Sequence, residues 1–168
     1  MEILARSILN IPELNPLPQM MEGGALPALI SGLAPIHRAH LAAAMRLETG
    51  MPLFVVCSDD TAAESMAHAL AAFLDMDEVP VLLSRSLALY NAESVSHMSE
   101  QKRLQLLYRL MKGSCPVAVC TISALLQRTV PPEMLEKAAL EFKSGSSIKP
   151  EEAEERLLRC GYRRTDQV

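Results

Sequence analysis

The chain has 168 residues, of which 49% are hydrophobic and 21% are charged, and its net charge is −4. This composition is typical of a folded globular domain and excludes a disordered chain. Because Lys and Arg that neutralise phosphates supply most of the affinity for nucleic acids, the acidic balance disfavours tight DNA binding by this chain alone.

The start of the chain, MEILARSILNIPELNP, has neither a basic segment nor a long apolar stretch. It therefore does not fit a signal peptide. No run approaches the ~18 consecutive apolar residues that a membrane span needs. We expect a cytoplasmic protein without a membrane partner.

Four cysteines occur, at Cys57, Cys115, Cys120 and Cys160. They form no C-x-x-C pair, and the four histidines do not stand beside them at zinc-ligand spacings. Three of the four lie in or beside apolar runs. We interpret these three as small buried side chains of a reducing compartment, and we favour this interpretation over a metal site.

The elements follow the order expected of parallel βαβ units. Residues 1–24 form a lead-in, with an amphipathic helix over residues 1–10 and a loop rich in Pro, Asn and Gly after it. Beyond the lead-in, short apolar runs alternate with helical patterns, and the expected strands are residues 28–30, 53–57, 79–83 and 116–121. We predict one α/β domain over residues 1–168, with a mostly parallel sheet flanked by helices.

Three longer helices separate these strands. The first covers about residues 35–49 and ends at Gly50. Thr61 and Glu64 fit the capping box of the second, which should bury Leu70 among its apolar positions. The third, over residues 100–111, should turn Leu104, Leu107 and Met111 inward.

For the last part of the chain, the sequence predicts short elements and one helix with clear start and stop signals. Turns are expected over residues 123–128 and 132–137, and a short strand over residues 140–143. Pro150 fits the first position of the final helix, and Gly161 fits its end.

The segment after the first expected strand is where a nucleotide-binding α/β domain carries its phosphate loop, G-x-x-x-x-G-K-[ST]. Here Gly32 matches the first glycine, but His37, Arg38 and Ala39 stand at the second glycine, the lysine and the hydroxyl residue. Alanine cannot ligate magnesium, and His37 and Pro35 obstruct a phosphate-binding backbone nest. We interpret the segment as an ordinary strand-to-helix turn with Pro35 at its first helical position. An arginine-based phosphate grip is the less favoured alternative.

Other polar residues give weaker signals. Asp59 and Asp60 follow the second expected strand, where nucleotide hydrolysis would need a carboxylate, but helix capping is the favoured role. Ser96, His97 and Glu100 contain the groups of a catalytic triad, although neighbours in a polar loop rarely converge. No catalytic or metal-binding residue is therefore assigned.

Arginines near the C-terminus could meet a phosphate. Four glutamates precede them, however, so a solvated and charge-balanced helix end is the favoured interpretation. The arginines are Arg156, Arg159, Arg163 and Arg164.

Several stretches in sequence order resemble the N-terminal, UvrB-like part of the transcription-repair coupling factors. They are LISGL at 29–33, LFVVCSD at 53–59, LYNAESVS at 89–96, RLQLL at 103–107, VCTISALLQR at 119–128 with the following Pro131-Pro132, and CGYRRTDQV at 160–168. The resemblance covers nearly the whole chain. It departs at residues 83–87, LSRSL, where the family usually has a Pro-x-x-Glu-like element.

The resemblance implies a parent protein that releases RNA polymerase stalled at DNA lesions and recruits UvrA for nucleotide excision repair. It implies a degenerate P-loop fold like UvrB domain 1a, without a cofactor in this part, since ATP and magnesium belong to the parent's motor domains. UvrA contacts in the family lie mainly in the adjoining domain, and RNA polymerase and DNA are reached through the parent. We therefore expect a non-catalytic scaffold and interaction module that contacts other domains of the parent. The first alternative is a weak nucleotide-binding ATPase domain, as in UvrB. A DNA-contacting domain is the least favoured alternative.

Overall fold

The structure is a computed structural model that describes residues 2–24, 27–84, 97–140, 145 and 149–164. The chain divides into two compact units, Met1–Arg128 and Thr129–Val168. The single domain expected over residues 1–168 stays a prediction.

A three-stranded parallel sheet forms the centre of the first unit. Its order is β1-β3-β2, where β1 is Leu53–Cys57, β2 is Val81–Leu82 and β3 is Val117–Thr121. Val119 of β3 lies opposite Val55 on one side and Val81 on the other. Parallel neighbours need crossover connections, which the intervening helices supply. The predicted α/β class, with a parallel sheet flanked by helices, is confirmed.

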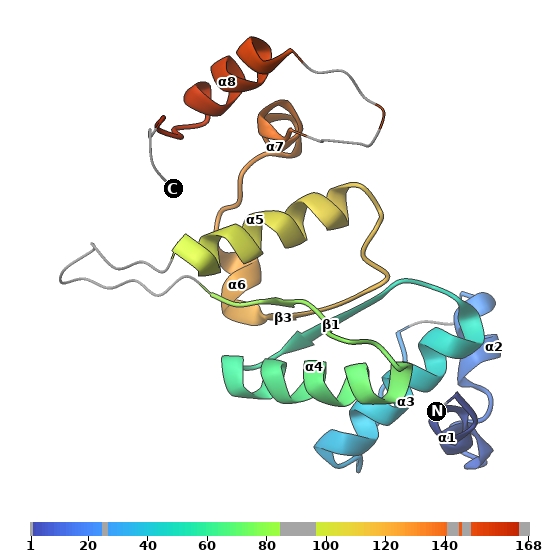
Figure 1. Ribbon diagram of the computed structural model, residues 1–168. Helices are drawn as coiled ribbons and strands as arrows, with labels where there is room; N and C mark the ends of the chain where they lie inside the picture. The colour runs from blue at the N-terminus through green and yellow to red at the C-terminus, as the bar shows by residue number, and fades with distance from the viewer. Residues whose placement is uncertain (1, 25–26, 85–96, 141–144, 146–148, 165–168) are drawn as a thin grey trace. The chain divides into compact units, whose positions relative to one another are not determined.

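Helices cover both faces of this sheet (Figure 1). On one side lie α3 (Pro35–Thr49) and α4 (Asp60–Leu74), and on the other α5 (His97–Met111) and α6 (Ile122–Leu126). Each helix follows a strand or precedes one, as a crossover requires.

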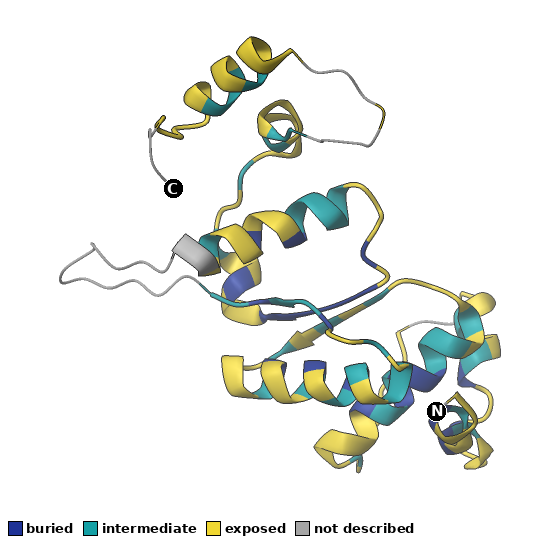
Figure 2. Ribbon diagram, viewed as in Figure 1, coloured by how far each residue is buried: buried dark blue, intermediate teal, exposed yellow. Residues whose placement is uncertain are grey.

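β3 supplies the middle of the core, and all five of its residues are buried (Figure 2). Successive side chains of a strand point to opposite faces. Val117 and Val119 accordingly pack with α3 and α4, whereas Ala118 and Cys120 pack with α5 and α6. Thr121 ends the strand, and its hydroxyl oxygen caps α6 by accepting a hydrogen bond from the Ala124 N–H at 3.2 Å.

The lead-in packs on α3. It contains α1 (Glu2–Arg6), a 3₁₀ turn η1 (Ser7–Asn10) and α2 (Leu17–Glu22). Apolar residues of these elements form a third buried cluster with α3, made of Ile8, Leu14, Leu17, Leu41 and Ala44. The helix α2 lies inside the predicted loop, and that part of the prediction was wrong. Its proline at position 18 falls in the first turn, where no N–H is needed.

The expected first strand, residues 28–30, does not form. These residues belong to no helix or strand, and the side chain of Leu29 is 96% exposed. A run of three residues gains few ladder hydrogen bonds, and Pro27 before it has no N–H to donate. The described part of the sheet therefore has three strands instead of four, and β1 lies at its edge.

The buried face of α5 agrees with the prediction at Leu107, which packs against the core, and differs from it at Leu104. Leu106 and Arg103 are buried, whereas Leu104 is 36% exposed. Arg103 also lies on the buried face, where its Nη1 donates to the Leu83 carbonyl oxygen at 2.9 Å. A charged residue can enter a core when it is hydrogen-bonded there.

The second unit contains α7 (Pro132–Ala138) and α8 (Pro150–Arg159). Pro150 begins α8 as predicted, and Gly161 (φ 88°) ends it, with the Tyr162 N–H donating to the Leu157 carbonyl at 3.1 Å. This is the left-handed helix ending that glycine favours. Of the strand expected over residues 140–143, only Leu140 belongs to the described residues.

Every helix in the described ranges is too short or too polar to cross a membrane.

Leu70 allows a direct test of the core. Its side chain is fully buried between α4 and the sheet. We expect Leu70→Ala to lower the free energy of unfolding by about 2–5 kcal/mol, since it removes buried contacts and leaves a cavity. Urea denaturation would measure this change. Leu126→Ala is the control, because Leu126 is 83% exposed, and its effect should stay within about 0.5 kcal/mol. Equal effects of the two changes would contradict the assigned core.

Candidate functional site

A crevice of about 810 Å³ lies at the carboxyl end of β1. Ligands of open α/β sheets bind in crevices beyond the carboxyl ends of the strands. The N-terminal turns of α3 and α4 form its walls, and the end of β1 forms its floor. Its lining residues are Pro35, Ile36, Arg38 and Ala42 from α3, residues 55–59 from β1 and the turn after it, and Thr61, Ala62, Ser65, Met66 and Ala69 from α4.

The first turn of α3 offers few backbone donors to an anion. Ala34 stands at its N-cap without a side-chain hydrogen bond, and Pro35 has no N–H. The His37 and Arg38 N–H groups both donate to the Ala34 carbonyl, at 2.9 and 3.1 Å. A phosphate at a helix N-terminus normally accepts hydrogen bonds from N–H groups that have no partner within the helix. The His37 and Arg38 N–H groups already have one.

Of the four residues that match the phosphate-loop positions, only Arg38 lines the crevice. Its Nε donates to the Leu33 carbonyl at 3.1 Å, which ties the guanidinium to the turn before α3. His37 is exposed. Gly32 has a positive φ of 82°, and no atom lies within 4 Å of the position that a Cβ would take. Its backbone is therefore open to solvent on that side. Ala39 is fully buried in the core cluster against α4. The structure thus does not bring the four residues together.

Asp59 lines the crevice just before α4. Its carboxylate accepts hydrogen bonds from the Ala62 N–H at 2.9 Å and the Ser58 hydroxyl at 2.7 Å. The Ser58 hydrogen bond, followed by that from Ala62, holds the pKa of Asp59 below its usual value. Asp59 is the N-cap of α4, as the favoured capping role predicted.

The capping box expected at Thr61 and Glu64 was wrong. Both residues lie inside α4, because the helix begins at Asp60, before the expected box. Asp59 and Thr61, two positions apart, could each cap this helix start, and the Asp59 carboxylate does so. Thr61 and Ser65, one helical turn apart, both line the crevice. The sequence pattern assigns Thr61 a capping role only, and Ser65 was not among the predicted site residues.

The cysteines follow the predicted pattern in part. Cys115 and Cys120 are buried, Cys57 is half-buried at the end of β1, and Cys160 is exposed. Burial raises the pKa of the Cys57 thiol, and the nearby Asp59 carboxylate adds to the effect. Burial likewise raises the pKa of Cys120, with a further contribution from Cys57. Both groups are neutral thiols at neutral pH and hence poor nucleophiles.

The remaining candidates are the Ser96, His97 and Glu100 group and the arginines near the C-terminus. Ser96 lies outside the described residues, so the Ser96, His97 and Glu100 group stays untested. At the end of α8, Arg159 pairs with Glu155 and Arg164 with Glu154. This agrees with the expected balance of charge at that helix end. Searched over the described residues, the side chains of His, Cys, Asp and Glu form no group of three or more that could hold a metal ion.

Comparison with known proteins gives one distant similarity. The chain is 27% identical over 145 residues to the transcription-repair-coupling factor of Bacillus subtilis (strain 168). The aligned part is 83% of this chain but only 12% of that protein. No family model matches the chain, and no solved structure matches it.

The pH dependence of stability should report the Asp59 cap. A carboxyl group whose pKa is lowered by folding stabilises the protein above its usual pKa of 3.8, and this contribution is lost as the pH falls through the lower folded value. We therefore expect Asp59→Ala to be less stable than the unsubstituted chain at neutral pH, and the difference to shrink in acid. Urea denaturation at several pH values would measure it.

Two matched changes control this experiment. Asp59→Asn keeps a neutral acceptor for the Ala62 N–H and should cost less than Asp59→Ala. Asp77→Asn removes an exposed carboxylate outside any cap and should change stability little at any pH. A pH-independent loss in Asp59→Ala would show that the carboxylate charge has no part in the cap.

Proposed function

We propose that this chain is a non-catalytic scaffold and interaction module of a transcription-repair coupling factor. The observation that carries the proposal is the similarity to the Bacillus subtilis factor, which extends over 83% of the chain. Since the chain spans only 12% of that protein, the activity of the whole factor is proposed for a parent and not for this part. The parent would release RNA polymerase stalled at DNA lesions and recruit UvrA for excision repair.

The crevice supports a role without catalysis. A working phosphate loop needs free backbone donors, a mobile cation and a hydroxyl for magnesium. Here Pro35 lacks the donor, Arg38 is hydrogen-bonded to Leu33, and Ala39 is a buried methyl group. The proposed work of this unit is then to hold neighbouring domains in place, including the adjoining domain that would contact UvrA.

One observation favours a second candidate function, a weak nucleotide-binding domain. The crevice has room for a nucleotide, and the N-terminal turns of two helices flank it. Helix N-termini attract anions through their partial positive charge. The acidic Asp59 at the same place opposes a triphosphate, which makes this the weaker candidate.

Thermal denaturation with ATP and magnesium distinguishes the two candidates. A ligand present at a hundred times its Kd stabilises the folded state by about 2.7 kcal/mol. We expect no rise in the melting temperature in millimolar ATP. The comparison variant combines His37→Gly, Arg38→Lys and Ala39→Ser, which gives these three positions the residues of the phosphate-loop pattern. The pattern accepts serine or threonine at the last position, and the smaller serine limits the clash with α4. Stabilisation of the unsubstituted chain by ATP would favour the nucleotide-binding candidate over a pure scaffold.

Calorimetry with purified UvrA tests the partner assignment. We expect no binding tighter than about 100 µM to residues 1–168, and clear binding to a longer form that includes the adjoining domain of the parent. This result follows if residues 1–168 only support the adjoining domain and do not contact UvrA themselves. Similar affinities of the two forms would mean that part of the UvrA-binding surface lies in this chain.

A further inference from the structure

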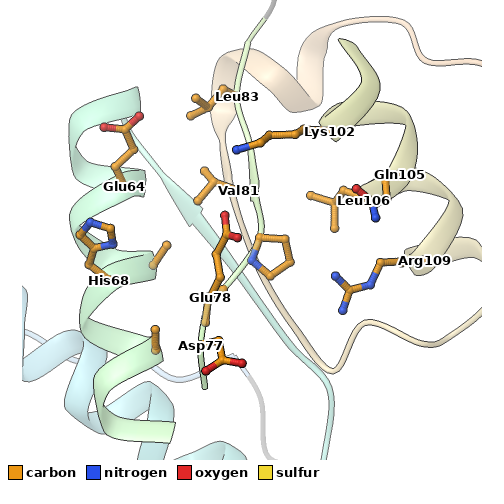
Figure 3. Close-up of a pocket in the computed structure, with 14 residues that line it drawn as sticks. Glu64, His68, Asp77, Glu78, Val81, Leu83, Lys102, Gln105, Leu106 and Arg109 are labelled. Atoms are coloured by element: carbon orange, nitrogen blue, oxygen red, sulfur yellow. The ribbon is translucent and has the colours of Figure 1, made fainter. Parts of the chain in front are cut away.

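A second hollow of the first unit, which we call the edge groove, runs along the outer edge of β2. Its volume is about 530 Å³. α4 forms one wall and α5 the other, and β2 lies between them (Figure 3). Each helix turns one stripe at positions i, i+3, i+4 and i+7 into the groove. The stripes are Glu64, Ala67, His68 and Ala71 on α4, and Lys102, Gln105, Leu106 and Arg109 on α5.

The floor of the edge groove offers backbone hydrogen bonds. Among the described residues, β2 pairs with β3 on its inner side and with no strand on its outer side, and the Val119 N–H donates to the Pro80 carbonyl at 3.0 Å. Successive residues of a strand direct their backbone groups to alternate sides. The N–H and C=O of Val81 therefore point toward the groove. An added strand could pair with them, whereas a helix could not, since its backbone groups are bonded internally.

The two walls carry opposite charge. Glu64 of α4 and the loop residues Asp77 and Glu78, which precede β2 between the two helices, form the acidic side, and Lys102 and Arg109 of α5 form the basic side (Figure 3). In the described part of the chain no ion pair joins one wall to the other. All but the half-buried Arg109 are exposed. The charges thus lie on opposite sides of the groove, and no ion pair between described residues neutralises them.

These features select the chemistry of a partner. In an extended strand, alternate side chains point to opposite faces, so one set would face α4 and the other α5. We propose that the edge groove binds an extended peptide segment of another protein, in which cationic and anionic side chains alternate. Its backbone pairs with β2, its Lys or Arg residues face the acidic wall, and its Asp or Glu residues face the basic wall. Nucleic acid fits less well, because the acidic wall would repel its phosphates.

The inference does not depend on the proposed repair function, and a pair of synthetic peptides tests it. One consists of four Lys-Glu repeats, and the other has four lysines followed by four glutamates, so their composition and net charge are identical. Only the first can place all its lysines on one face of a strand. By fluorescence anisotropy at low salt, we expect the alternating peptide to bind about ten-fold more tightly, as several exposed ion pairs together allow.

A charge-reversal variant locates the binding. Lys102→Glu with Arg109→Glu makes both walls acidic, and we expect it to weaken binding of the alternating peptide about ten-fold. Lys137→Glu with Arg163→Glu changes the net charge equally at exposed positions of the second unit and should leave binding within about two-fold. If Arg109→Glu impairs folding, as circular dichroism would reveal, Lys102→Glu alone or Glu64→Lys on the opposite wall serves instead, with a smaller loss.

Hydrogen exchange adds a readout of the backbone pairing. Exchange of the Val81 amide should slow on binding of the alternating peptide, because that N–H then donates to the added strand. Equal binding of the two peptides would overturn the proposal. So would unchanged binding by the wall variants, or an unprotected Val81 amide at saturation.

Discussion

Ala39 and Ala43 of α3 pack against Ala63 and Ala67 of α4, and this contact holds the two helices together on one face of the sheet. All four alanines are at most 4% exposed. The distance between packed helices depends on the size of the side chains at their contact, and methyl groups permit a close approach. Leu70 and the valines of β3 then complete the core beneath the pair.

This contact also positions the crevice and limits its chemistry. With α3 and α4 held side by side, their first turns both lie at the carboxyl end of β1. The same contact buries Ala39, which stands where a phosphate loop has its magnesium-binding hydroxyl. A larger polar residue there would have to displace α4, and overpacking of a core is costly. The departure from the phosphate-loop pattern at Ala39 and the close helix packing thus involve the same residue.

The two edges of the sheet present different surfaces. On β1, Phe54 and Val56 are 44% and 48% exposed on the face away from α3 and α4. β2 instead lies between charged helical walls. Charged side chains beside an open edge prevent unselective strand pairing, yet they leave the edge accessible to a strand of complementary charge. Selectivity at β2 would therefore come from side chains, while its backbone supplies the hydrogen bonds.

Local patterns in the sequence were sufficient to predict the class of fold, and within it the elements with strong signals. The helix from Pro35 to its stop at Gly50, the buried strand ending at Thr121 and the helix from Pro150 all follow from apolar periodicity, capping and proline or glycine stops. The departures from the phosphate-loop pattern at His37, Arg38 and Ala39 were also visible in the sequence, because that pattern is defined by residue type.

Tertiary structure alone decided the rest. Residues 28–30 have a strand-like composition but do not form a strand, since a strand exists only where a neighbour pairs with it. α5 buries Arg103 and Leu106 because the Leu83 carbonyl and the sheet face it from that side. The edge groove unites stripes from two helices that are distant in sequence. Periodicity identifies one face of a helix, but only packing determines what that face meets.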